Sequence, residues 1–170
     1  MRREYGFERT ACACRRCTIS CEHVPGALSP EDLPRIAVHL GYGMDVAAFS
    51  RENLLASDGI RVTTDRGEVV HLPMLVPAAQ SNGHCKFLHA GQCSIHAASP
   101  YGCAFIDAHQ GNEEYAVRAD ALYRALYEDH NRRGAYVKVW DDLHSSGLIA
   151  LPLEMRSSRL HAAMRGEKLL

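Results

Sequence analysis

Cysteine thiols are the groups in this chain whose type and spacing could do chemistry. All seven fall into two blocks, one within the stretch ACACRRCTISC at residues 11 to 21 and one between residues 85 and 103. They are Cys12, Cys14, Cys17, Cys21, Cys85, Cys93 and Cys103. Thiolates are soft ligands, so they favour zinc, copper(I) or iron–sulfur clusters over calcium or magnesium.

The spacing within the first block suits metal ligands. Cys14 and Cys17 are separated by two residues, a gap that lets both sulfurs reach one metal ion or one cluster. Cys17 and Cys21 are four residues apart, which is one turn if this stretch is helical. Cys12 and Cys14 are too close to share one side of a helix, so we expect Cys12 to lie in a loop.

Composition and charge limit the setting in which these thiols work. The chain begins with the charged stretch MRREYGFERT, without an apolar core of a secretory signal, and no run approaches the roughly 18 apolar residues of a membrane span. We therefore expect a cytoplasmic protein with no membrane contact, in which thiols stay reduced. An odd number of cysteines also excludes complete internal disulfide pairing. The net charge of −1 gives no overall field that would recruit nucleic acid.

Two helices and a hairpin are predicted between the cysteine blocks. The segment Ser29 to Asp32 has a capping serine, a proline and two acids, which is typical of a helix start, and Gly41 can end this helix. Asp45 can cap a second helix, which carries Val46, Phe49 and Leu54. Strand-like segments at 61–64 and 68–72 flank a turn at 65–67, and this pattern predicts a hairpin. We expect Pro73 and Pro77 to limit its second strand.

The rest of the chain is predicted to be irregular and then helical. Residues 78–105 are turn-rich, and Asn112 can cap a long helix over 113–132 whose apolar stripe is Tyr115, Ala119, Leu122, Tyr123 and Leu126. We expect a short strand or turn at 136–140 and a terminal helix at 153–165. The predicted fold class is α+β: one helix-rich small domain over residues 1–170, with a β-hairpin, organised around a cysteine-ligated metal site. Its metal-binding core is expected at 12–105 and its helical part at 106–170.

The second block, CKFLHAGQCSIHAASPYGCAF at residues 85–105, resembles the second half of the YkgJ-like cysteine-cluster family. That family is described as a zinc- or iron-chelating domain, with the pattern Cys-x-Phe-Leu, Gly-x-Cys-x-Ile-Tyr and Arg-Pro-x-x-Cys-x-x-Phe. Its first half, Cys-x-x-Cys-x-x-Cys-Cys, fits residues 14–21 with Ser20 at the third cysteine. The resemblance covers residues 12–105, and residues 106–170 match no pattern that we recognise.

The resemblance implies that the three later cysteines join the first block in one site. Ser20 removes one expected thiolate, and we propose that the extra Cys12 restores the number. Ser99 stands in place of the family's arginine, and His96 in place of its tyrosine. Since His96 lies between two implied ligands, it is the first non-cysteine candidate, ahead of His23, His84, Asp107 and His109. The predicted metal ligands are Cys12, Cys14, Cys17, Cys21, Cys85, Cys93, Cys103 and His96.

Several functions are compatible with so many thiols. Seven thiols exceed one tetrahedral ion, so they fit either a four-cysteine [4Fe–4S] cluster with spare thiols or two metal centres. The first hypothesis is an iron–sulfur protein in electron transfer or a redox accessory of a partner protein. The second is a structural zinc module. The third is a metal-dependent modifying enzyme, because some relatives of the family are linked to lysine methylation of flagellin; whether this chain is an enzyme stays open.

We also expect a protein partner, because a small cluster protein without a catalytic motif usually acts through another polypeptide. The apolar residues of the C-terminal part are Trp140, Leu143, Leu148 and Leu151. Grouped apolar residues that are exposed mark interfaces. These four therefore either form part of that interface or complete the protein's own core.

Overall fold

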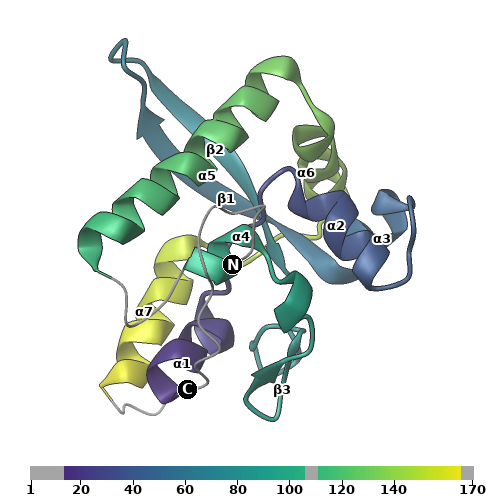
Figure 1. Cartoon of the computed structure of the whole chain (residues 1–170), viewed down its shortest axis with the longest axis vertical. Coiled ribbons are helices and arrows are strands. Elements are labelled where there is room, and N and C mark those ends of the chain that lie inside the picture. Colours follow the sequence, from purple (N-terminus) through teal and green to yellow (C-terminus); the bar gives the residue numbers. More distant parts are fainter. Residues whose placement is uncertain (1–13, 106–110, 166–170) are drawn as a thin grey trace.

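The computed structural model describes residues 14–105 and 111–165 (Figure 1). These residues form a small α+β domain of seven α-helices around a long antiparallel hairpin. The predicted class, a helix-rich α+β domain with a β-hairpin, is confirmed. The helices are α1 (Arg15–His23), α2 (Asp32–His39), α3 (Val46–Asn53), α4 (Tyr101–Phe105), α5 (Asn112–Arg132), α6 (Ala135–Ser145) and α7 (Leu153–Met164), with a 3₁₀ turn η2 (His96–Ala98). The strands are β1 (Leu54–Thr63), β2 (Val69–Pro77), β3 (Leu88–His89) and β4 (Gln92–Cys93). None of the helices in the described ranges is long and apolar enough to cross a membrane.

The hairpin of β1 and β2 is longer than the sequence indicated. Its turn lies at 65–67 as predicted, but pairing continues to Leu54 opposite Pro77. The expectation that Pro73 limits β2 is wrong, because β1 bulges opposite it between Ser57 and Ile60. A proline has no N–H to donate, and a bulge removes the need for that ladder bond. Gly59 makes the bulge possible, since it has φ +71 and a Cβ there would lie 1.9 Å from the Leu72 carbonyl oxygen.

Helices cover the hairpin and close the core. In Figure 1, α5 crosses the hairpin, and α5 and α6 both contact β2 while α3 and α6 contact β1. Tyr136 of α6 is fully buried, and its hydroxyl accepts the N–H of Leu75 at 2.6 Å and donates to the carbonyl of Leu28 at 2.9 Å. Burial is also the main reason that the pKa of Tyr136 is raised above its ordinary value. This side chain thus joins the hairpin to the segment that follows α1.

Most predicted helices are present, with corrections at their borders. The prediction that Asn112 caps the long helix is wrong, because Asn112 is the first residue of α5 and Gly111 is the N-cap. Asp45 caps α3, where its carboxylate accepts the N–H of Ala48 at 2.9 Å, but Leu54 begins β1 instead of belonging to that helix. The strand or turn predicted at 136–140 is wrong, because these residues lie within α6. The carboxylate of Asp129 accepts the N–H of Val137 at 3.0 Å near the start of α6, which satisfies a donor that a helix start leaves unpaired.

The long helix α5 turns most of its predicted stripe inward. Ala119, Leu122 and Leu126 are buried and Tyr123 is half-buried, whereas Tyr115 is 44 % exposed. Arg118 pairs with Glu114 and keeps only 12 % of its side chain exposed. The C-terminal half of α5 therefore packs against the core more closely than its N-terminal half.

The apolar residues of the C-terminal part named above mainly complete the protein's own core. Leu143 is fully buried, Leu148 packs against the core, and the indole N–H of Trp140 donates to the Ser57 carbonyl at 2.8 Å. Residues 148–150 also pair with β1 around Ala56, as a short parallel addition to the hairpin. Leu151 is the exception at 45 % exposed.

Candidate metal centre

Helix α1 positions the first cysteine block. Cys14 is its N-cap residue with extended backbone, and its carbonyl accepts the N–H groups of Cys17 at 2.9 Å and Thr18 at 3.1 Å. The helix then carries Cys17 and Cys21 one turn apart, as the four-residue spacing predicted. It is held in place by contact with α7, beside which it lies in Figure 1, and by the buried side chain of Ile19.

The thiols of Cys14 and Cys17 have the separation of two ligands of one metal ion. Their sulfur atoms are 3.7 Å apart. Two thiolates bound to one tetrahedral ion at about 2.3 Å stand about 3.8 Å apart. Because Cys14 is exposed, an ion could reach the pair from solvent with little change in the fold.

The second block meets the first at the end of α1. The backbone N–H of Cys85 donates to the carbonyl of Cys21 at 3.0 Å. The loop around Cys85 is fixed by Gln80, whose side-chain amide donates to the carbonyls of Cys85 at 2.9 Å and Leu88 at 2.7 Å. The small hairpin of β3 and β4 pairs Leu88 with Cys93 and so turns the chain back toward this loop.

Burial controls the chemistry of Cys85. The pKa of this thiol is raised to about 12, mainly by burial, and the nearby thiols of Cys21 and Cys93 contribute to the same upward shift. Hydrogen bonding from the backbone of Phe87 and Leu88 acts in the opposite direction and favours the thiolate. Three thiols from both blocks are therefore close enough to influence one another's charge. A bound cation would reverse this balance, because thiolate ligands must lose their protons.

Cys103 is held by a close crossing of two backbone segments. Its thiol lies 3.7 Å from the carbonyl oxygen of Gly26, and the N–H of Gly102 donates to the Ala27 carbonyl at 2.9 Å. A Cβ at Gly26 would lie 2.1 Å from the backbone of Gly102, so neither segment can carry a larger residue at the crossing. Since residue 26 follows α1 closely, this crossing keeps Cys103 on the side of the domain where the first block lies.

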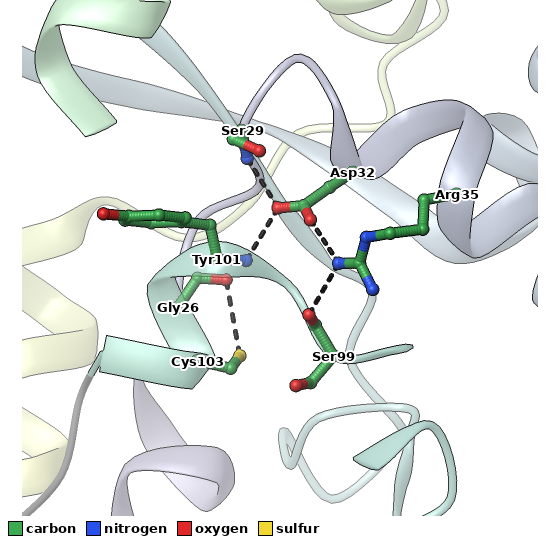
Figure 2. A network of polar contacts seen from close by, with 7 residues as sticks. All are labelled: Gly26, Ser29, Asp32, Arg35, Ser99, Tyr101 and Cys103. Carbon is green, nitrogen blue, oxygen red and sulfur yellow. Dashed lines mark hydrogen bonds and ion pairs between the residues drawn. The ribbon is translucent and has the colours of Figure 1, made fainter. Parts of the chain in front are cut away.

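A buried ion pair fixes the segment that leads to Cys103 (Figure 2). The Asp32 carboxylate, at the start of α2, is fully buried and accepts the N–H groups of Ser29 at 2.8 Å and Tyr101 at 2.7 Å. It also pairs with the guanidinium of Arg35, which donates in turn to the Ser99 carbonyl at 2.9 Å. The carboxylate therefore ties residues 99–101 to α2.

Of the two backbone bonds to Asp32, only the one from Ser29 is between near neighbours in the sequence. Ser29 was expected to cap α2, but the bond that forms runs from its N–H to the side chain of Asp32. The N-cap of α2 is Glu31, and Asp32 is its first residue, so the expected cap by Ser29 is wrong. The bond between Ser29 and Asp32 is nevertheless local, since it spans three residues. The bond to Tyr101 spans 69 residues, and no local pattern indicates it.

The structure brings some predicted ligands together and leaves others apart. Cys21, Cys85 and Cys93 are neighbours, and Cys14 and Cys17 form a pair. His96 is exposed in η2, and the His84 ring stands edge-on to that of His23 at 5.8 Å between centroids.

Not all predicted ligands lie within the described residues. Cys12, Asp107 and His109 fall outside them. Within residues 14–105 and 111–165, no three side chains of the Cys, His, Asp and Glu types form a group that could hold a metal ion. A metal at this place therefore needs a ligand from outside these ranges or a shift of the thiols toward it.

Comparisons with known proteins give no further guide to the site. No family model, curated protein or solved structure matches this chain.

Proposed function

We propose that this chain is a metal-binding protein whose two cysteine blocks hold an iron–sulfur cluster, in electron transfer or as a redox accessory of a partner protein. The observation that carries the proposal is the meeting of Cys85 with Cys21 across a backbone bond of 3.0 Å, with Cys93 near enough to affect the same thiol. Thiols this close repel one another when they are ionised to thiolates, and a cation bound between them would offset this electrostatic repulsion.

The donors that are present suit such a centre in kind. Cysteine thiolates are the standard ligands of iron–sulfur clusters, and hydrogen bonds to their sulfurs tune the reduction potential. The backbone of Phe87 and Leu88 already supplies such bonding to Cys85. The missing ligand is assigned to Cys12, which precedes Cys14 by two residues and lies outside the described ranges.

A structural zinc ion is the second candidate, and one distance favours it. The 3.7 Å between the sulfurs of Cys14 and Cys17 is the spacing of two thiolates on one tetrahedral ion. In a [4Fe–4S] cluster each cysteine binds its own iron, so a pair that shares one ion indicates a mononuclear site or an iron with two cysteine ligands. A closed zinc site of this kind would contribute folding energy and no redox activity.

Metal analysis separates the two candidates. The protein is purified anaerobically, and its iron, zinc and acid-labile sulfide are measured against protein concentration. Iron with an equal amount of sulfide and a brown absorption supports the cluster, whereas zinc without sulfide supports the structural ion. Protein that takes up neither metal after reconstitution contradicts both.

The ligand assigned outside the described ranges is tested by a matched pair of variants. Cys12→Ala should lose metal, whereas Ser20→Ala should keep it, because a serine hydroxyl is a poor ligand for a soft metal. Both changes fall in the first block and remove one polar group. Equal metal content in the two variants would show that Cys12 does not replace the thiol absent at Ser20.

A further inference from the structure

A cavity of about 590 Å³ lies beside the second cysteine block. It is bounded by the end of α1, by the chain from residue 76 to 85 and by α7. This volume is within the range of about 300–1,000 Å³ that small-molecule sites occupy. Cys85 of the second block contributes to its wall, as does His23, which lies two residues after Cys21.

The charged side chains of the cavity wall are all of one sign. Arg156 and Arg159 line it, together with the neutral polar groups of Asn82 and Gln80, and the described residues of the wall include no aspartate or glutamate. The remaining wall is largely apolar, with Leu55, Val76, Pro77 and Leu151 among its residues. A ligand with an apolar body and one anionic group would complement such a wall.

Arg156 is the positively charged residue of the wall whose side chain is held in place by hydrogen bonds. The residue is only 8 % exposed, and its guanidinium donates to the Leu151 carbonyl at 2.9 Å and to the Ser57 hydroxyl at 2.8 Å. Both acceptors are neutral, and in the described part of the chain no carboxylate lies within 4.0 Å of it. Burial lowers the pKa of Arg156, with the charge of Asp58 acting against this shift. Asp58 is linked to the guanidinium through Ser57, whose hydroxyl donates to the Asp58 carboxylate at 3.1 Å. Since arginine keeps its charge in proteins, a buried guanidinium without a directly bonded carboxylate favours an external anion.

Arg159 supplies a second, more accessible guanidinium. It lies three residues after Arg156 on α7, so the two side chains are neighbours on the same helix face. A methyl group at Gly83 would lie 3.4 Å from Nη1 of Arg159, which places this guanidinium against the loop before Cys85. His84 and His23 stand beside the same loop.

We propose that this cavity is a binding site for a small organic anion, a molecule with an apolar body and a carboxylate or phosphate group that Arg156 and Arg159 bind. Guanidinium groups bind both anions through paired, charge-assisted hydrogen bonds. The site goes beyond the proposed metal centre and does not depend on it, because none of its anion-binding groups is a cysteine. Its position would place a bound molecule next to Cys85.

Calorimetric titration of the full chain with three probes tests the proposal. The probes are hexanoate, hexanamide, which has the same chain without the charge, and inorganic phosphate. We expect hexanoate or phosphate to bind and hexanamide to bind at least about tenfold more weakly than hexanoate, because a charge-assisted bond is lost. Binding of hexanoate alone identifies a carboxylate ligand, and binding of phosphate alone identifies a phosphate ligand.

Two variants assign the binding to this cavity. Arg159→Gln should weaken the anion that binds by about tenfold or more. Arg124→Gln, on the exposed face of α5 and outside the cavity, should leave the affinity unchanged. Arg159→Lys keeps the charge and should retain part of the binding, and it replaces Arg159→Gln if the circular dichroism of the latter shows loss of fold. No binding of either anion, equal binding of hexanamide, or wild-type affinity in Arg159→Gln would overturn the proposal.

Discussion

Removal of the Asp32 carboxylate should be among the most damaging single changes in this protein. Asp32→Ala removes the carboxylate that pairs with the Arg35 guanidinium, whose side chain is 25 % exposed, and that accepts the N–H groups of Ser29 and Tyr101. Breaking a buried ion pair costs about 3–5 kcal/mol. Each unpaired buried donor costs about 1–3 kcal/mol on its own, but these terms share one carboxylate and do not add. We expect the free energy of unfolding to fall by about 3–5 kcal/mol.

The magnitude is measurable because the total is small. A domain of this kind has a free energy of unfolding of about 5–15 kcal/mol, so the variant should unfold at a clearly lower urea concentration. Urea titration followed by circular dichroism gives both midpoint and slope. The matched control is Asp120→Ala, which breaks an ion pair with Arg124 whose side chains are 60 % and 73 % exposed. Exposed pairs contribute about 0–1 kcal/mol, so this control should change little.

A second pair of variants tests whether the carboxylate acts through the arginine. The interaction energy between Asp32→Ala and Arg35→Ala, taken from a double-mutant cycle, should be large compared with that between Asp120→Ala and Arg124→Ala. Asp32→Ala should also lower metal content, because residues 99–101 lead directly to Cys103 (Figure 2). A loss of stability below about 1 kcal/mol, equal to that of the exposed control, would refute the reasoning about burial.

Four further predictions test other parts of the structure. Gly102→Ala would place a Cβ 2.5 Å from the backbone of Ala27 and should lower the free energy of unfolding, measured in urea, by about 1–3 kcal/mol. The control is Gly111→Ala, whose Cβ would have nothing within 4 Å and which should cost less than about 1 kcal/mol. Tyr136→Phe leaves a buried N–H and a buried carbonyl without their shared hydroxyl and should lower the melting temperature, at a cost of about 1–3 kcal/mol. In metal-free protein at pH 8, iodoacetamide should alkylate Cys85 about 1000-fold more slowly than a thiol with a pKa of 9.0. The reason is that a pKa of about 12 leaves Cys85 with little thiolate at this pH. Equal labelling of Cys85 and the exposed Cys14 would contradict this. The neutral Cys85 thiol also stabilises the metal-free fold below pH 9.0, and this contribution should be lost as the pH rises toward about 12.

The amino-acid sequence by itself determined the elements that depend on near neighbours. The apolar spacing of α2, the Asp45 cap of α3 and the turn at 65–67 could all be predicted, because each is formed by contacts within a few residues. The four-residue spacing of Cys17 and Cys21 gives one turn because this stretch is helical, but the sequence left the helix itself open. The prediction at 136–140 failed because α6 depends on residues outside that stretch. Asp129 accepts the N–H of Val137, and Tyr136 bonds to Leu28 and Leu75.

Only the tertiary structure decided which distant residues meet. The bond of Asp32 to Tyr101 spans 69 residues, and the crossing of Gly26 with Gly102 depends on two glycines that no local pattern joins. The cavity likewise needs α7 to pack on α1, which brings Arg156 to the wall that also contains Cys85. Such contacts depend on the shape and volume of the whole core. A buried polar group forms its hydrogen bond with the group that core packing brings next to it, which is often far away in the sequence.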